Sequence, residues 1–65
     1  MRDPRIDPKV GDVLTKNGDR REIRQVRIHY IEVRTSKIWD GANWLYPTLG
    51  QFRKWAATAS VEKIA

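Results

Sequence analysis

The sequence predicts a mainly β fold: a small five-stranded barrel with one short helix before the last strand. Three observations support this prediction. Asn17-Gly18 is the strongest hairpin-turn dipeptide in the chain, because a type I′ turn needs a positive φ at both central residues. The segment Arg20–Lys37 holds the densest run of β-branched residues, which favour strands. A helical stripe of apolar residues follows a capping-box sequence near the C-terminus.

The chain is short and has few ways to stabilise a core. Its 65 residues make one domain, which we place at residues 10–65. A domain of this size buries only about 60% of its unfolded surface. There is no cysteine and a single histidine, His29, so a disulfide and a cysteine- or histidine-based zinc cluster are excluded and no cofactor is expected. The core must come from aliphatic side chains, Phe52 and the three tryptophans.

The charge of the chain is strongly positive. The net charge is +5 and the pI is about 10.1, which favours polyanionic partners, although solubility alone also explains the excess. No apolar run approaches the roughly 20 residues that span a bilayer. Residues 1–9 lack the apolar core of a secretory signal. Together with the lack of cysteine, these features lead us to expect a cytoplasmic protein without a membrane partner.

The first two elements are an arm and a strand. Residues 1–9 contain two Asp-Pro dipeptides and are expected to form an extended N-terminal arm, because a residue before proline avoids the helical region. Val10–Lys16 follows as the first strand. Within it, Gly11 indicates a bulge or a close approach of another part of the backbone. The Asn17-Gly18 turn then joins this strand to the second.

The second strand does not alternate cleanly. Ile23 and Val26 are three residues apart, which breaks the two-residue period and requires a bulge or a turn. We place a tight turn at Arg27–His29, between strands Arg21–Val26 and Tyr30–Thr35. One long bent strand is the alternative. A helix matches the spacing but not the β-branched content.

Besides a helix, four further elements complete the predicted order. They are a strand beginning at Lys37–Trp39, a turn at residues 40–43, a returning strand Trp44–Tyr46 and a closing strand Ser60–Ile64. Between the last two strands, Thr48 and Gln51 have capping-box spacing. We therefore expect Leu49–Thr58 to form a helix whose apolar stripe, which includes Phe52 and Trp55, closes the barrel.

This order of elements resembles that of the small SH3-like β-barrels, the class that includes KOW and Tudor-type modules. The resemblance is carried by Val10–Leu14, by the basic strand ending in Val26, and by a helix followed by Ser60–Ile64. The chain also resembles short phage and prophage proteins that have an Asp-Pro arm, a GDVL strand, here Gly11–Leu14, and an FRKWA segment, here Phe52–Ala56. These resemblances imply an SH3-like fold and a phage or prophage origin, but no chemistry.

The chain also departs from functional members of that class. A KOW motif has a glycine in the hairpin where this chain has Arg27–His29. A Tudor-type methyl-lysine reader needs aromatic residues on neighbouring loops, whereas Trp44 and Tyr46 share one face of one strand. Asn43–Pro47 resembles the active-site strand of type II dihydrofolate reductases, but Trp44 replaces their glutamine. His29 has only Glu32 as a nearby carboxylate, so we expect the chain not to be an enzyme.

Basic and aromatic side chains form the candidate site. The candidate nucleic-acid-binding residues are Arg20, Arg21, Arg24, Arg27, Arg34, Lys37, Trp39 and Trp44. Spaced cations suit contacts to phosphates, and exposed members of the aromatic set Trp39, Trp44, Tyr46 and Tyr30 suit stacking on bases. The simpler interpretation is a solvated face whose charge protects an edge strand, with the tryptophans in the core.

Two binding functions follow from these residues. We expect a small basic module that binds DNA or RNA. The alternative is an accessory module for protein–protein interaction, a phage regulator or inhibitor that meets an acidic protein partner through the same face. Homo-oligomer formation is compatible with both, because so small a core gains stability from assembly.

Overall fold

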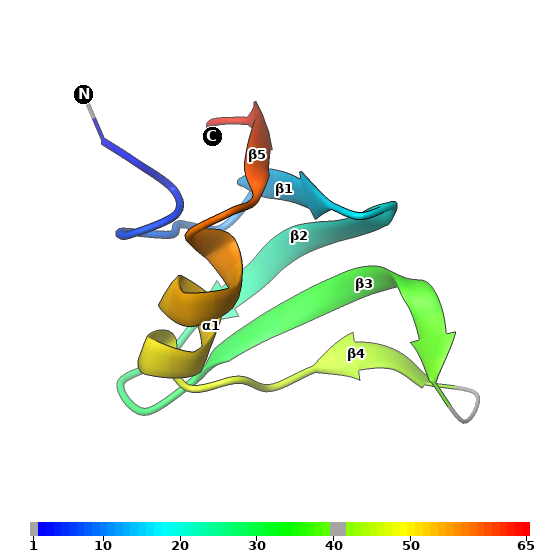
Figure 1. Cartoon of the computed structure of the whole chain (residues 1–65). Coiled ribbons are helices and arrows are strands. Elements are labelled where there is room, and N and C mark those ends of the chain that lie inside the picture. The colour runs from blue at the N-terminus through cyan, green and yellow to red at the C-terminus, as the bar shows by residue number, and fades with distance from the viewer. Residues whose placement is uncertain (1, 40–41) are drawn as a thin grey trace.

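The computed structural model of the chain describes residues 2–39 and 42–65, and the side chains of residues 2–36 and 43–65. The described residues form β1 (Val13–Lys16), β2 (Asp19–Val26), β3 (Ile31–Trp39), β4 (Ala42–Leu45), α1 (Leu49–Ala56) and β5 (Ser60–Lys63) (Figure 1). The prediction of a mainly β chain with one short helix before the last strand is confirmed.

The strands make a single antiparallel sheet. Its order is β4-β3-β2-β1-β5, so β4 and β5 are the two edges of the described sheet and hydrogen bonds do not close it. The helix α1 connects these edges in the chain, and Figure 1 shows it between the β1–β5 end of the sheet and β4. The sheet thus has an inner face toward α1 and an outer face away from it.

The first hairpin follows the turn chemistry of its sequence. Asn17 has φ 51° and Gly18 has φ 80°, as the type I′ prediction requires. The strand before this turn begins at Val13 and not at Val10, which corrects the prediction. Gly11 has φ 97°, outside the strand region, and a Cβ on Gly11 would lie 3.0 Å from the Cβ of Ala65. The amide of Gly11 donates to the carbonyl of Ile23 and the amide of Ile23 donates to the carbonyl of Asp12, both at 2.9 Å, so two residues lie opposite Ile23 and the predicted bulge at Gly11 is confirmed.

The second hairpin contains both a turn and a bulge. Val26 pairs with Ile31, and the amide of Arg27 donates to the carbonyl of Tyr30 at 2.9 Å, so the loop extends one residue beyond the predicted turn. One long bent strand is therefore wrong. The register shifts between Ile23 and Gln25, which leaves Arg24 as the extra residue of a bulge. The bulge places Ile23 and Val26 on the same face of the sheet despite their three-residue spacing, and Val26, at the end of β2, is still 45% exposed.

The backbone of residues 37–39 continues β3 and does not start a separate strand, which corrects the prediction at Lys37–Trp39. The predicted turn at residues 40–43 falls partly on residues 40–41, which lie outside the described part of the chain. The returning strand is Ala42–Leu45, so it begins earlier than predicted and ends before Tyr46. Beyond it, the amide of Ile31 donates to the carbonyl of Pro47 at 2.9 Å, which keeps this segment beside β3.

The helix begins as its capping box predicts. The Thr48 hydroxyl accepts from the Gln51 amide at 3.2 Å, and the Gln51 side chain accepts from the Thr48 amide at 3.0 Å. The helix ends at Ala56, two residues before the predicted Thr58. At eight residues it is far shorter than a bilayer span, and the described residues contain no helix long and apolar enough for one.

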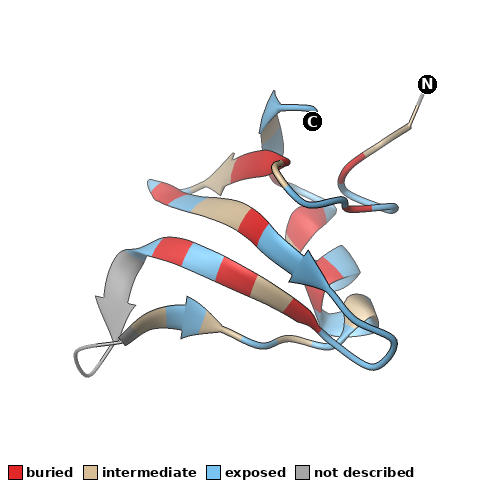
Figure 2. Ribbon diagram, turned by 180° about the vertical axis from the view of Figure 1, so that it is seen from behind, coloured by how far each residue is buried: buried red, intermediate tan, exposed pale blue. Residues whose placement is uncertain are grey.

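The core lies between the inner face of the sheet and α1. Its buried apolar residues are Leu14, Ile23, Ile31, Val33, Phe52, Ala56 and Ala59. Figure 2 shows the buried positions alternating with less buried ones along β3, as expected for a strand with one covered face. Trp55 is only partly buried and packs against this cluster, with its ring 6.2 Å from that of Phe52.

The N-terminal segment folds back onto the domain, which corrects the predicted extended arm. The amides of Ile6 and Asp7 both donate to the carbonyl of Asp3, at 2.9 and 2.8 Å, and make a turn. Pro4 and Pro8 are buried. The physical reason lies far away in sequence: a buried carboxylate at residue 12 needs a cationic partner, and the N-terminal segment supplies it.

Candidate nucleic-acid interface

The outer face of the sheet is built by strand alternation. Along β3, residues 31, 33 and 35 are buried, while Glu32, Arg34 and Ser36 point the other way. Arg34 pairs with Glu22 of β2 on one side and with Trp44 of β4 on the other. Glu22, Arg34 and Trp44 therefore make one row across three strands, which we call the outer row.

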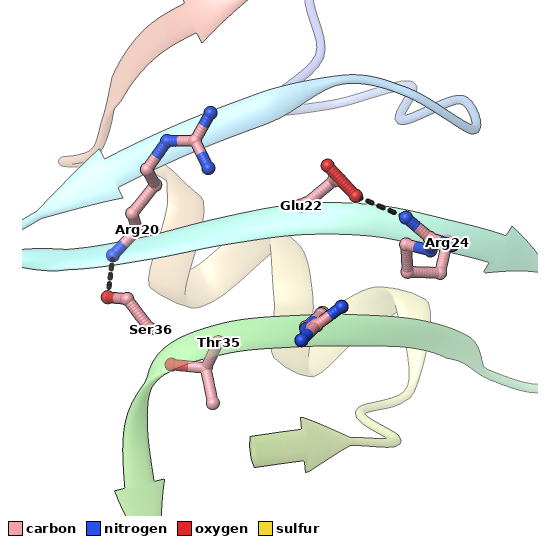
Figure 3. Close-up of a pocket in the computed structure, with 6 residues that line it drawn as sticks. Arg20, Glu22, Arg24, Thr35 and Ser36 are labelled. Atoms are coloured by element: carbon pink, nitrogen blue, oxygen red, sulfur yellow. Dashed lines mark hydrogen bonds and ion pairs between the residues drawn. The ribbon is translucent and has the colours of Figure 1, made fainter.

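A hollow lies beside this row on the outer face. Three arginines from two strands surround it, together with short polar side chains: its lining is Arg20, Glu22, Arg24, Arg34, Thr35 and Ser36. Figure 3 shows Arg20, Glu22 and Arg24 on β2 and the other two labelled residues on β3. The hollow has a volume of about 280 Å³. The structure thus brings three of the predicted site residues together.

Two of the three arginines have carboxylate partners. Arg24 Nη1 lies 2.6 Å from Glu22 Oε1, and Arg20 Nε lies 3.1 Å from Glu62 Oε1. The hydrogen bond from Arg24 is the largest influence on Glu22 and holds the pKa of its carboxyl below the ordinary value. The charges of Arg20 and Arg34 act in the same direction. Glu22 is therefore an anion held among cations.

Arg34 has a different environment from the other two. Its guanidinium carbon lies 5.8 Å from the centroid of the Trp44 ring, and no carboxylate of the described residues pairs with it. Trp44 is 38% exposed, so it lies outside the core. An arginine near the face of an accessible indole is a cation–π contact. This contact makes Trp44 part of the same surface as the hollow.

Two tyrosines extend the aromatic surface. Tyr46 is two residues after Trp44 and is 59% exposed. Its ring packs edge-on against that of Tyr30, with centroids 6.1 Å apart and an interplanar angle of 71°. Both tyrosines belong to the aromatic set considered for base stacking from the sequence, although the final set of candidate residues includes only the tryptophans Trp39 and Trp44.

The structure separates Arg21 from the other candidate residues. Its Nε lies 2.8 Å from Asp19 Oδ2, and its guanidinium carbon lies 4.1 Å from the centroid of the Trp55 ring. Its side chain is only 16% exposed. Asp19 also accepts from the Thr35 hydroxyl. Arg21 thus takes part in a packed polar cluster beside α1, because neighbouring residues of a strand point to opposite faces.

The remaining candidate residues do not line the hollow. Arg27 is exposed in the loop between β2 and β3, next to Ile28, which is 93% exposed. The side chains of Lys37 and Trp39 lie outside the described residues. Arg20, Arg24, Arg34 and Trp44 are therefore the predicted residues that one described surface brings together.

The charge of the outer face is mixed. Its described arginines are Arg20, Arg24 and Arg34, and the carboxylates among them or beside them on the strands are Glu22, Glu32 and Glu62. Three cations and three anions give a local net charge near zero, although the whole chain carries +5. The predicted basic face is thus a face of alternating charge. Its distinctive feature is arginine beside exposed aromatic rings.

The described residues contain no group of three or more histidine, cysteine, aspartate or glutamate side chains that would hold a metal ion. Comparison of the chain with protein-family models, with curated proteins and with solved structures finds no match.

Proposed function

We propose that this chain is a small binding module that holds nucleic acid on its outer face, in the phage or prophage setting that its sequence resembles. The observation that carries the proposal is Arg34 beside the exposed ring of Trp44, next to a hollow lined by Arg20 and Arg24. Aromatic rings with neighbouring arginines are a common platform for bases and phosphates.

We interpret the sheet as an SH3-like barrel. The strand order β4-β3-β2-β1-β5 and the helix before the last strand support this interpretation. The packing of Phe52 and Ala56 of α1 into the core supports it too, because the helix covers the space between the two sheet edges.

The ion pairs on the outer face are compatible with phosphate binding. Arg24 and Glu22 are both partly exposed, with side chains 48% and 31% accessible. Ion pairs at such exposure contribute only about 0–1 kcal/mol, since water screens them. A phosphate can therefore replace Glu22 as the partner of Arg24 at a small cost in free energy. Arg34 forms no ion pair with a carboxylate of the described residues, so phosphate binding to Arg34 breaks no such pair.

Titration of labelled single-stranded and duplex oligonucleotides at low salt tests this function. We expect the affinity to fall with salt on a log–log plot, with a slope of about 0.7–0.9 for each phosphate contacted. The double variant Arg24→Ala/Arg34→Ala should bind more weakly and show a smaller slope. The matched control Lys9→Ala/Lys54→Ala removes the same charge from exposed positions that do not line the hollow. Failure of every oligonucleotide to bind the unmodified chain would refute the proposal.

A second candidate function has its own observation. Val26, Ile28, Tyr30 and Tyr46 are exposed by 45%, 93%, 40% and 59%, and all lie in or beside the loop between β2 and β3. A gathering of exposed apolar side chains favours a protein interface. Arg27 in the same loop suits an acidic partner. This alternative predicts that Ile28→Ser abolishes partner binding or self-association, which sedimentation measures, while oligonucleotides fail to bind.

A further inference from the structure

We infer that the nucleic acid held by the outer face is single-stranded, with an unpaired base stacked on Trp44 and an adjacent phosphate in the hollow. This inference rests on the proposed function and names its class of ligand.

Trp44 is placed to stack on a base. It lies on β4, which is an edge of the sheet, and its side chain leaves the core on the outer face beside Arg34. A base within a duplex is covered on both sides by its neighbours. Only an unpaired base has a free face for an indole, which is why proteins that bind single strands use exposed aromatic rings.

Arg34 joins the aromatic ring to the hollow. It contacts Trp44 across the β3–β4 pairing, and it also lines the hollow with Arg20 and Arg24. Adjacent strands are about 4.8 Å apart, so the ring and the hollow are neighbours along the outer row. One nucleotide can therefore place its base over Trp44 while its phosphate meets the arginines.

The charge balance argues against a duplex ligand. Non-specific affinity for a duplex comes from cations that neutralise phosphates. The outer face offers three described arginines that are matched by three glutamates, and two of the arginines are already paired. Phosphate contacts alone therefore give this face a weak affinity. Contact with unpaired bases supplies the additional binding energy that a duplex does not offer.

The spacing of the aromatic residues also fits an extended strand. Trp44 and Tyr46 are two residues apart, which corresponds to about 6.7 Å along a β-strand. The hydrogen bond from Ile31 to Pro47 keeps Tyr46 beside β3, and Tyr30 supports its ring edge-on. Stacked bases in a duplex strand are about 3.4 Å apart. Successive bases therefore reach both rings only when the strand is stretched, as single strands permit.

The test compares single strands that have free bases with ligands whose bases are missing or paired. Oligothymidylate and oligouridylate are single strands that contain deoxyribose and ribose, respectively. An abasic oligonucleotide of equal length has the phosphates but no bases, and in a duplex of equal length the bases are paired. We expect the single strands to bind roughly 5- to 150-fold more tightly than the abasic strand, the range that stacking of one base gives. Trp44→Ala should remove most of this difference and leave only the part that stacking on Tyr46 supplies, and Trp44→Phe should retain most of it. Far-ultraviolet circular dichroism verifies that each variant is folded.

The outcomes separate this inference from the proposed function. Equal affinity for the single strands and the abasic strand refutes base stacking while nucleic-acid binding stands. Tighter binding of the duplex, unchanged by Trp44→Ala, also refutes it. If no ligand binds even at low salt, the proposed function itself fails. As a matched control, Lys54→Ala should leave the ratio between single and abasic strands unchanged, because it removes a charge on α1 and no aromatic ring.

Discussion

Arg2 holds the buried carboxylate of Asp12 through both of its terminal nitrogens. Nη2 donates to Oδ1 at 2.9 Å and Nη1 donates to Oδ2. The amides of Lys9 and Ala65 donate to the same carboxylate at 2.7 and 2.8 Å, and Arg2 also donates to the carbonyl of Ala65. Asp12 is fully buried. It therefore ties the N-terminal segment, the start of β1 and the end of the chain into one cluster.

Replacement of Asp12 by asparagine should lower the free energy of unfolding by about 1–3 kcal/mol, because buried donors then lose a charged acceptor. Urea denaturation followed by tryptophan fluorescence measures the change. Asp7→Asn is the matched control, since Asp7 is exposed and its substitution should alter stability by less than about 0.5 kcal/mol. Equal stability of Asp12→Asn and the unmodified chain would show that the cluster contributes nothing to folding.

The same carboxylate predicts a pH dependence of stability. Burial by itself would raise the pKa of Asp12, but the hydrogen bonds from Arg2, Ala65 and Lys9 and the charge of Arg2 outweigh it and lower the pKa to about 2. The unfolded chain takes up this proton first as pH falls, so the stabilisation is present above about pH 4 and is lost as pH falls toward 2. Its size is about 2 kcal/mol.

Denaturation curves at neutral pH and at several acidic pH values measure this loss. The Asp12→Asn variant should lose less free energy of unfolding between neutral and acidic pH than the unmodified chain, because residue 12 then no longer titrates. If the free energy of unfolding falls equally in the unmodified chain and in Asp12→Asn between pH 5 and 2, the acid sensitivity comes from other carboxylates.

Gly11 and Gly50 make a matched pair of glycines. Gly11→Ala should destabilise the fold by roughly 1–2 kcal/mol, because φ is 97° and the new Cβ would lie 3.0 Å from that of Ala65. Gly50→Ala should leave stability unchanged or raise it by up to about 1 kcal/mol, since Gly50 is helical and the new Cβ would lie 4.0 Å from the Thr48 hydroxyl oxygen. Thermal denaturation compares them, and the reverse order would contradict the backbone conformation at Gly11.

Arg21 and Arg24 are three residues apart and should behave in opposite ways. Arg21→Ala should lower stability by about 1–2 kcal/mol, because it removes the contact with Trp55 and leaves Asp19 without its cation. It should leave oligonucleotide binding unchanged. Arg24→Ala should keep stability and weaken binding. Denaturation and oligonucleotide titration of both variants measure these effects. Weaker oligonucleotide binding by a stably folded Arg21→Ala variant would contradict the assignment of the binding site to the outer face.

Local rules accounted for much of the fold. The Asn17-Gly18 turn and the Thr48–Gln51 capping box depend on residues close in sequence, and both were predictable. The folding back of the N-terminal segment was not predictable, because it depends on the ion pair between Arg2 and Asp12, and no local sequence pattern indicates this pair. The first strand likewise starts later than predicted, since Gly11 has φ 97°, outside the strand region, and the position of Ala65 beside it depends on the other end of the chain.

The candidate site was predictable in kind but not in detail. The sequence indicated arginines on one hairpin, yet their faces depend on the bulge at Arg24 and on the register against β3. The pairing of Arg34 with Trp44 joins residues on different strands, so no local spacing reveals it. The glutamates that balance the arginines were visible in the sequence, but Glu62 reaches Arg20 only in the fold.

The central claim is that the outer face binds nucleic acid through Arg24, Arg34 and Trp44. Its most direct test is the low-salt titration of a labelled single-stranded oligonucleotide with the unmodified chain and with Arg24→Ala/Arg34→Ala. We predict salt-sensitive binding by the unmodified chain and a large loss in the folded double variant, with Lys9→Ala/Lys54→Ala retaining most of the affinity. Equal binding by the two double variants, or no binding by the unmodified chain, would contradict the claim.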